Sequence, residues 1–134
     1  MNKVFPAELE ELDNVLAFAD TELEKVDCPM KVQSAVDVCL EEVFVNIAHY
    51  AYPGENGTAE IDVEADDSEK SVTIRLVDSG VPFDPLAKAD PDTSLQAGER
   101  QIGGLGIFMV KKMMDSVEYE YSEGKNILTI KKFF

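Results

Sequence analysis

One segment with residues that could bind a ligand is a turn that begins with an aspartate, at the end of an apolar run. There the chain reads Asp78-Ser79-Gly80-Val81-Pro82-Phe83. The Asp78 carboxylate could accept a hydrogen bond from an exocyclic amine such as that of adenine, and Gly80 would let the backbone approach a flat ring. Pro82 and Phe83 could form an apolar wall beside that ring. The alternative is a plain strand-ending turn, because Asp-Ser-Gly is also favourable turn chemistry.

A glycine cluster further along the chain could bind phosphate groups. It reads Gly103-Gly104-Leu105-Gly106 and opens an apolar segment. Unpaired N–H groups and the positive end of the helix dipole point outward at a helix N-terminus, which favours phosphates. Arg100, just before the cluster, could meet a terminal phosphate. The cluster could instead serve only to let a helix pack closely on the sheet.

The two segments together predict a nucleotide site that lacks a Walker A loop. The pattern GxxxxGK[ST] occurs nowhere in the chain. The cluster GGLG differs from GxGxxG, and no acidic residue follows it at the spacing typical of a Rossmann site.

A carboxylate and an amide could act together on a helix before these segments. Glu42 and Asn46 are four residues apart, so they lie about 40° apart on the helical wheel and share a face. Such a pair suits Mg²⁺, which takes one or two protein oxygens and keeps phosphates and waters as its other ligands. The carboxylate could then orient or deprotonate a nucleophile. The alternative is that Glu42 and Asn46 are only a solvated pair, since such pairs are common on solvent-exposed helix faces.

Two helices are predicted in the first half of the chain, after a short N-terminal strand. Pro6 can begin the first helix, and the second runs from about Pro29 to Ala51. Each helix carries an apolar stripe at helical spacing. The stripe of the first helix comprises Leu9, Leu12, Leu16, Ala19, Leu23 and Val26. The core face of the second comprises Val32, Val36, Cys39, Val43, Ile47 and Tyr50.

Alternating apolar and polar residues predict two hairpins in the rest of the chain. Ala59–Ala65 and Val72–Val77 form the first, and Val117–Tyr121 with Ile127–Lys132 form the second. A third helix is expected from Gly104 to Asp115. The alternation along the four predicted strands leaves one face of the sheet exposed to solvent. We therefore expect an α/β (α+β) two-layer sandwich, a mixed and mostly antiparallel sheet with helices on one face, as a single domain over residues 1–134.

Residues 84–103 fit no regular pattern. They carry Pro85, Pro91 and Gly98 and little periodicity. A long irregular loop inside a compact domain is uncommon and is usually functional or disordered. Because this loop lies between the two candidate nucleotide segments, we expect a lid over a ligand. Disorder without function is the alternative.

The composition excludes several classes of protein. The 134 residues carry 27 acidic and 12 basic side chains, a net charge of −15. This disfavours nucleic acid and anionic lipid as partners, since both require basic surfaces. No apolar run is long enough to span a membrane, and the N-terminus has no signal-peptide core. Two cysteines and one histidine exclude a disulfide scaffold and make zinc unlikely to be bound. We expect a cytoplasmic protein.

Three segments, taken in order, resemble the motifs of a known superfamily. Glu42–Tyr52, then Asp78–Phe83, then Gly103–Ile107 resemble the N, G1 and G2 boxes of the GHKL ATPases, which include gyrase, histidine kinases and mismatch-repair ATPases. The resemblance covers nearly the whole chain. It is strongest to the small anti-sigma-factor serine kinases of bacteria.

The resemblance implies a Bergerat-type ATP site with Mg²⁺. In it Asn46 would ligate Mg²⁺ and Glu42 would be the general base. Asp78 would bind the adenine amine, with Gly80 beside the ring. The backbone from Gly104 through Leu105 to Gly106 would hold phosphates under a lid.

The chain departs from the family pattern at two positions. Related kinases often have a histidine four residues after the N-box asparagine, where this chain has Tyr50, and His49 comes one residue early. A threonine often helps to bind adenine on the last hairpin, and Asn126 stands in that place. Nucleotide binding is expected to tolerate both changes.

The resemblance also implies partners and leaves alternatives. Such kinases transfer the γ-phosphate to a serine or threonine of an anti-anti-sigma partner, which competes with a sigma factor for the kinase, and they are often homodimers. One alternative is a nucleotide-responsive module that sequesters a partner without useful catalysis. Another is the detached catalytic domain of a histidine kinase, although no helix pair with a phosphoacceptor histidine is present in this sequence.

Overall fold

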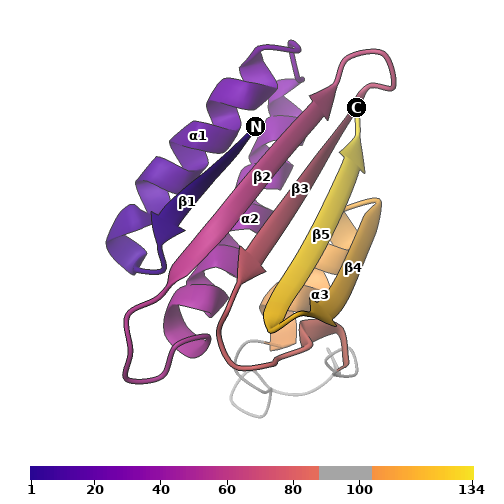
Figure 1. Ribbon diagram of the computed structural model, residues 1–134. Coiled ribbons are helices and arrows are strands. Elements are labelled where there is room, and N and C mark those ends of the chain that lie inside the picture. Colours follow the sequence, from indigo (N-terminus) through magenta and orange to yellow (C-terminus); the bar gives the residue numbers. More distant parts are fainter. Residues whose placement is uncertain (88–103) are drawn as a thin grey trace.

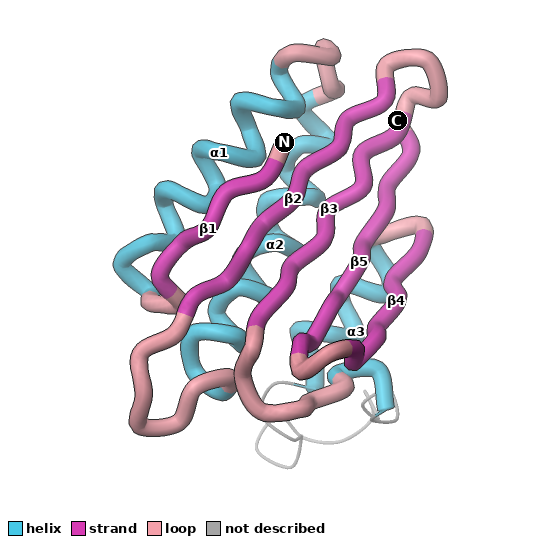
Figure 2. The backbone as a smooth tube through the Cα atoms, in the orientation of Figure 1, coloured by secondary structure: helices cyan, strands magenta, loops and turns pink. Residues whose placement is uncertain are grey.

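A five-stranded sheet is covered on one face by helices. The computed structural model describes residues 1–87 and 104–134. Figures 1 and 2 show the α-helices behind the sheet, and the other face of the sheet is open to the viewer. The expected two-layer α/β arrangement is therefore confirmed.

The sheet is antiparallel in all four pairings of its described strands. Its strands, in the spatial order β1-β2-β3-β5-β4, are β1 (Asn2–Pro6), β2 (Thr58–Asp66), β3 (Ser71–Asp78), β5 (Lys125–Phe133) and β4 (Ser116–Ser122). Both predicted hairpins form. The register places Asp78, the last residue of β3, opposite Asn126 on β5.

Alternation along the strands decides which residues enter the core, as expected. On β2, Ile61 and Val63 are buried while Glu64 is exposed. On β3, Ile74 and Leu76 are buried. Because successive side chains of a strand point to opposite faces, the helix-covered face is apolar and the open face carries most of the charge.

The first helix starts later than the sequence suggested. Pro6 ends β1, a 3₁₀-helix follows at Leu9–Glu11 (η1), and α1 spans Leu12–Glu24. The tighter turn of η1 shifts Leu9 out of the stripe, and 49% of its surface is exposed. Val15, which the predicted stripe omitted, is fully buried in its place.

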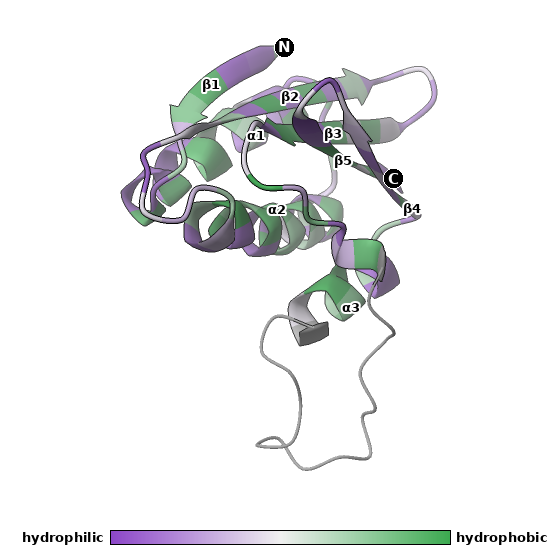
Figure 3. Ribbon diagram, turned by 60° about the horizontal axis from the view of Figure 1, so that its bottom comes forward, coloured by the Kyte–Doolittle hydropathy of each residue, from purple (hydrophilic) through white to green (hydrophobic). Residues whose placement is uncertain are grey.

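The second helix, α2 (Met30–Tyr50), is the central helix of the layer. It contacts α1 on one side and α3 (Gly104–Met113) on the other, and it also packs on β3. These neighbours bury Leu40 and Phe44, which the predicted stripe omitted. Tyr50, which the stripe included, is 49% exposed at the end of the helix. Figure 3 shows all three α-helices on the same side of the sheet.

The predicted irregular segment lies mostly outside the described residues. Its described start contains a short 3₁₀-helix, Pro85–Ala87 (η2), where the Leu86 N–H donates to Asp84 Oδ1 over 2.8 Å. Residues 88–103, on which the lid prediction depends, are not among those described. Within the described chain, no helix combines the length and apolar character that crossing a membrane requires.

Candidate functional site

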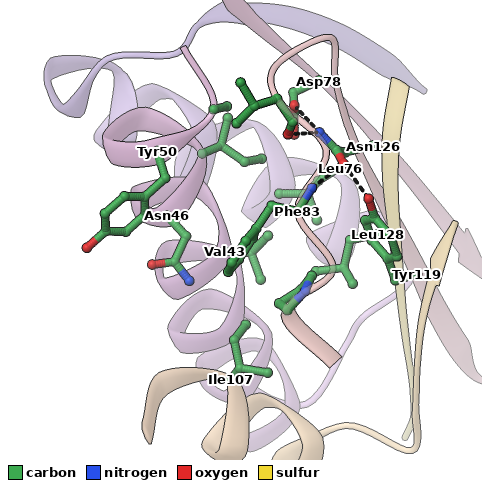
Figure 4. Close-up of a pocket in the computed structure, with 14 residues that line it drawn as sticks. Val43, Asn46, Tyr50, Leu76, Asp78, Phe83, Ile107, Tyr119, Asn126 and Leu128 are labelled. Carbon is green, nitrogen blue, oxygen red and sulfur yellow. Dashed lines mark hydrogen bonds between the residues drawn. The ribbon is translucent and has the colours of Figure 1, made fainter. Parts of the chain in front are cut away.

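A cavity lies where α2, the exit of β3 and the start of α3 meet. It has about 500 Å³ of empty space, part of it open to solvent. Most of its lining is apolar, including Val43, Leu76 and Ile107. Figure 4 shows Asn46 and Tyr50 on the α2 side of the cavity and Asp78, Asn126 and Tyr119 on the sheet side. A concave apolar pocket with a few converging polar groups is typical of a small-molecule site.

Asp78 is a buried carboxylate in this cavity. Only 7% of its surface is exposed. Its Oδ1 accepts hydrogen bonds from the Gly80 N–H and from Asn126 Nδ2, both over 2.9 Å. No hydrogen bond within the described chain engages its Oδ2. Asp78 therefore keeps one acceptor atom for a ligand.

The turn after Asp78 is fixed against the end of α2. The Val81 N–H donates to the Ala51 carbonyl over 2.9 Å. The Ser79 N–H donates to the Tyr52 hydroxyl over 2.8 Å, and that hydroxyl donates to the Thr58 carbonyl over 2.6 Å. The predicted turn is thus a rigid part of the cavity wall rather than a free loop.

The absence of a side chain at Gly80 is required by this close approach. A Cβ at Gly80 would lie 2.2 Å from the Ala51 carbonyl oxygen, which is a backbone atom and cannot swing away. From the sequence, Gly80 is expected to let the backbone approach a flat ring. The structure shows a close approach to α2.

Asn126 joins Asp78 to the segment that borders the cavity. Its Nδ2 donates to Asp78 Oδ1 and to the Val81 carbonyl, each over 2.9 Å. Its Oδ1 accepts from the Phe83 N–H over 3.1 Å and from the Tyr119 hydroxyl. Asn126 is 7% exposed. This network, drawn in Figure 4, holds Val81 to Phe83 against the sheet.

Tyr119 is a cavity residue that the sequence analysis did not select. Burial raises the pKa of its phenol, and a hydrogen bond from the Phe83 backbone opposes that rise. Tyr119 therefore stays protonated at neutral pH and can donate to Asn126. The sequence could have identified Tyr119 from its place on the inward face of the alternating β4 segment. A half-buried Tyr hydroxyl usually finds a hydrogen-bond partner.

Asn46 and Glu42 occupy different spaces. Asn46 lines the cavity that contains Asp78. Glu42 lies in a neighbouring recess between α2 and α3, together with Val38, Met109 and Met113. A Cβ at Gly106 would lie 1.8 Å from Glu42 Oε1, so the first turn of α3 rests on the Glu42 carboxylate. The helical spacing places both residues near α3 but not in one cavity.

Other predicted site residues are placed only in part. Gly104 and Leu105 are the first residues of α3, so its N-terminus adjoins the cavity wall formed by Ile107. Phe83 lines the cavity and is 43% exposed. Arg100 and Gly103 lie outside the described residues.

The donor set fits a nucleotide with magnesium better than a metal held by protein alone. Within residues 1–87 and 104–134, no group of three or more His, Cys, Asp or Glu side chains could hold a metal ion. The Asn46 amide offers a single oxygen from the cavity wall. Mg²⁺ commonly takes one or two protein ligands and completes its shell with phosphates and waters, so Asn46 fits that role when a nucleotide is bound.

Comparison with known families identifies the family of this chain. The family described as "Histidine kinase-like ATPase domain" matches residues 5–132. The chain belongs to this family, which confirms the resemblance stated from the motifs.

The relatives with assigned names are protein kinases. The serine-protein kinase RsbW of Listeria innocua serovar 6a is 31% identical over 98 residues, which are 70% of this chain and 62% of that protein. The serine/threonine-protein kinase BtrW of Bordetella bronchiseptica is 25% identical over 101 residues, 75% of this chain and 70% of BtrW. This chain thus matches under two thirds of the RsbW sequence. Among solved structures, the histidine kinase AdeS of Acinetobacter baumannii aligns with 99% of this chain and 67% of its own, at 13% identity and a TM-score of 0.49.

Proposed function

We propose that this protein is an ATP-dependent serine/threonine protein kinase that phosphorylates a small anti-anti-sigma-like protein in a partner-switching system. The observation that carries the proposal is the buried Asp78 with one unused carboxylate oxygen, in a cavity that Asn46 and the start of α3 also border. The named relatives RsbW and BtrW support protein kinase activity.

In the proposed complex the adenine ring lies in the apolar cavity with its amine on Asp78. Phe83 and Ile107 supply apolar surface for the ring. Asn46 holds Mg²⁺, which neutralises phosphate charge when bound. The backbone of Gly104, Leu105 and Gly106 donates to the phosphates, because the first N–H groups of a helix have no partner within it.

The proposed transfer moves the γ-phosphoryl group from ATP to a serine or threonine hydroxyl. The new bond joins phosphorus to the hydroxyl oxygen, the bond to the β-phosphate oxygen breaks, and ADP leaves. Glu42 orients the hydroxyl and takes its proton. Its place in the recess between α2 and α3 means that the partner protein would bring its hydroxyl to that side.

Phosphate transfer from MgATP to the partner tests this assignment. With a small anti-anti-sigma-like protein from the same genome as acceptor, Glu42→Gln should lower the rate at least about 100-fold, because general-base catalysis contributes that much. The matched control is Glu41→Gln, which removes the same charge from an exposed neighbour on α2. An unchanged rate in Glu42→Gln would contradict the role given to Glu42.

A sigma factor as second partner and a homodimer belong to the same proposal. Unphosphorylated acceptor and sigma factor would compete for the kinase. Mixing the purified proteins and separating them by size, with light scattering to give the mass of each peak, tests both points.

One observation favours a second candidate, a nucleotide-responsive binding module. The Glu42 carboxylate rests against Gly106 in a recess separate from the cavity of Asn46 and Asp78. Under this alternative, ATP would change the affinity for a partner, and Glu42→Gln would leave that change intact while no phosphate is transferred by the wild type.

A further inference from the structure

The hydrogen-bonding capacity of the Asn126 amide is used entirely within the protein. A side-chain amide has two N–H donors and two acceptor positions on its oxygen. Nδ2 donates to Asp78 Oδ1 and the Val81 carbonyl, and Oδ1 accepts from the Phe83 N–H and the Tyr119 hydroxyl. Asn126 therefore has no hydrogen bond left to offer a ligand, although it stands where related kinases often have an adenine-binding threonine.

We propose that Asn126 and Tyr119 are positioning residues that make the cavity selective for a base with an exocyclic amine, and that they act through Asp78. The inference rests on the proposed ATP site. It goes further because it assigns the choice of base to two residues that hold the carboxylate in place.

The orientation of the amide follows from its fixed partners. The Phe83 backbone N–H can only donate, and the Val81 carbonyl can only accept. These two groups direct Asn126 Oδ1 toward Phe83 and Nδ2 toward Val81 and Asp78. The Tyr119 hydroxyl adds a second donor on the Oδ1 side. A flipped amide would set its oxygen against Asp78 Oδ1 and the Val81 carbonyl, so the network opposes the flip.

Fixing Asn126 fixes the acceptor that remains for the base. Oδ1 of Asp78 is taken by the Gly80 N–H and Asn126 Nδ2, each at 2.9 Å, so the carboxylate cannot rotate without losing both bonds. An ionised carboxylate oxygen only accepts hydrogen bonds. The other oxygen of Asp78, Oδ2, therefore pairs with the 6-amino group of adenine. It repels the 6-oxo group that hypoxanthine carries at the same ring position.

Calorimetric titration with ADP and IDP in the presence of Mg²⁺ tests the inference, because these ligands differ only in the group at position 6 of the base and in the proton that hypoxanthine carries on the adjacent N1. The wild type should bind ADP at least about tenfold more tightly than IDP. Asn126→Leu keeps a similar volume and removes all four bonds, and it should reduce that ratio at least about fivefold. Tyr119→Phe removes one hydroxyl and should reduce the ratio about two- to threefold.

The control is Tyr121→Phe. It makes the same chemical change two residues along β4, where the side chain is 47% exposed and does not line the cavity. It should keep the wild-type ratio. Thermal unfolding of each variant without nucleotide shows whether the fold is retained, and Tyr119→Phe decides the matter if Asn126→Leu does not fold.

The outcomes separate the inference from the proposed function. If the folded variants lose affinity for ADP and IDP equally and keep the wild-type ratio, the two residues are merely structural and the inference is overturned. If the wild type binds neither ligand, the ATP site itself is wrong. A wild type that binds ADP and IDP equally would retain the nucleotide site and overturn the selectivity assigned to Asp78.

Discussion

At the scale of single residues, the shape of the turn after β3 depends on backbone groups as much as on side chains. Gly80 donates to Asp78, and Val81 donates to Ala51 at the end of α2. The Asp78 carboxylate is thus held by the chain immediately following it. Any substitution that moves this backbone also moves the carboxylate.

Gly80→Ala should damage the site more than the overall fold. The added Cβ would lie 2.2 Å from the Ala51 carbonyl oxygen, so the turn must shift away from α2. We expect a loss of about 1–3 kcal/mol in the free energy of unfolding and a fall of at least about tenfold in ATP affinity, by denaturant titration and calorimetry. Ser79→Ala is the control, since Ser79 is exposed and its N–H remains. Unchanged affinity in Gly80→Ala would show that Asp78 does not depend on this contact.

At the scale of elements, the contact between α1 and α2 contains two facing carboxyl groups. Oδ1 of Asp20 and Oδ1 of Asp37 are buried and have no hydrogen-bond donor. Two such groups can satisfy each other only if one of them carries a proton. Burial, and then the neighbouring Asp20, raise the pKa of Asp37 from 3.8 to about 7.

The free energy of unfolding should therefore fall as the pH rises from the ordinary pKa of Asp37 to its raised value. Between about pH 4 and pH 7 the folded state keeps a proton on Asp37 that the unfolded state has released, so raising the pH favours unfolding. We expect a fall of about 1 kcal/mol in the free energy of unfolding, a small figure because the carboxyl group is partly exposed.

Asp37→Asn should remove most of this dependence and stabilise the protein at pH 8. Denaturant titrations at several pH values would measure the effect. Asp13→Asn, which changes an exposed acid on the same pair of helices, should leave the pH dependence unchanged. Identical pH profiles for the wild type and Asp37→Asn would contradict the raised pKa.

At the scale of the whole molecule, the net charge of −15 opposes the binding of a polyanion. The proposed site brings the ATP phosphates to a helix N-terminus and a single side-chain amide. The chain as a whole has 12 basic and 27 acidic residues. Neutralisation of the phosphates would therefore depend largely on Mg²⁺.

Removing magnesium should weaken ATP binding at least about tenfold, which corresponds to about 1.4 kcal/mol. Calorimetry with Mg²⁺ and with EDTA measures this difference. Adenosine, which has no phosphate, is the control and should bind equally in both conditions. Equal ATP affinity with EDTA would mean that the protein alone neutralises the phosphates.

Local patterns in the sequence predicted most of the secondary structure and the closeness of Asn46 and Asp78. Period-two alternation predicted both hairpins, and helical spacing predicted α2 nearly to its ends, because each pattern repeats within a few residues. The motifs around Asp78 and Asn46 predicted that these residues share a pocket, and they line the same cavity.

Contacts between distant segments decided what local patterns could not. Val15 is buried on α1, which packs on α2 and β2, whereas Leu9 lies before α1 in η1 and is 49% exposed. Tyr50, the last residue of α2, is also 49% exposed. The filled amide of Asn126, the contribution of Tyr119 and the separation of Glu42 from the Asn46 cavity depend on β3, β4, β5 and α3 together. The sequence by itself determined which groups are available, and only the tertiary structure decided their partners, because hydrogen bonds and packing form between residues far apart in the chain.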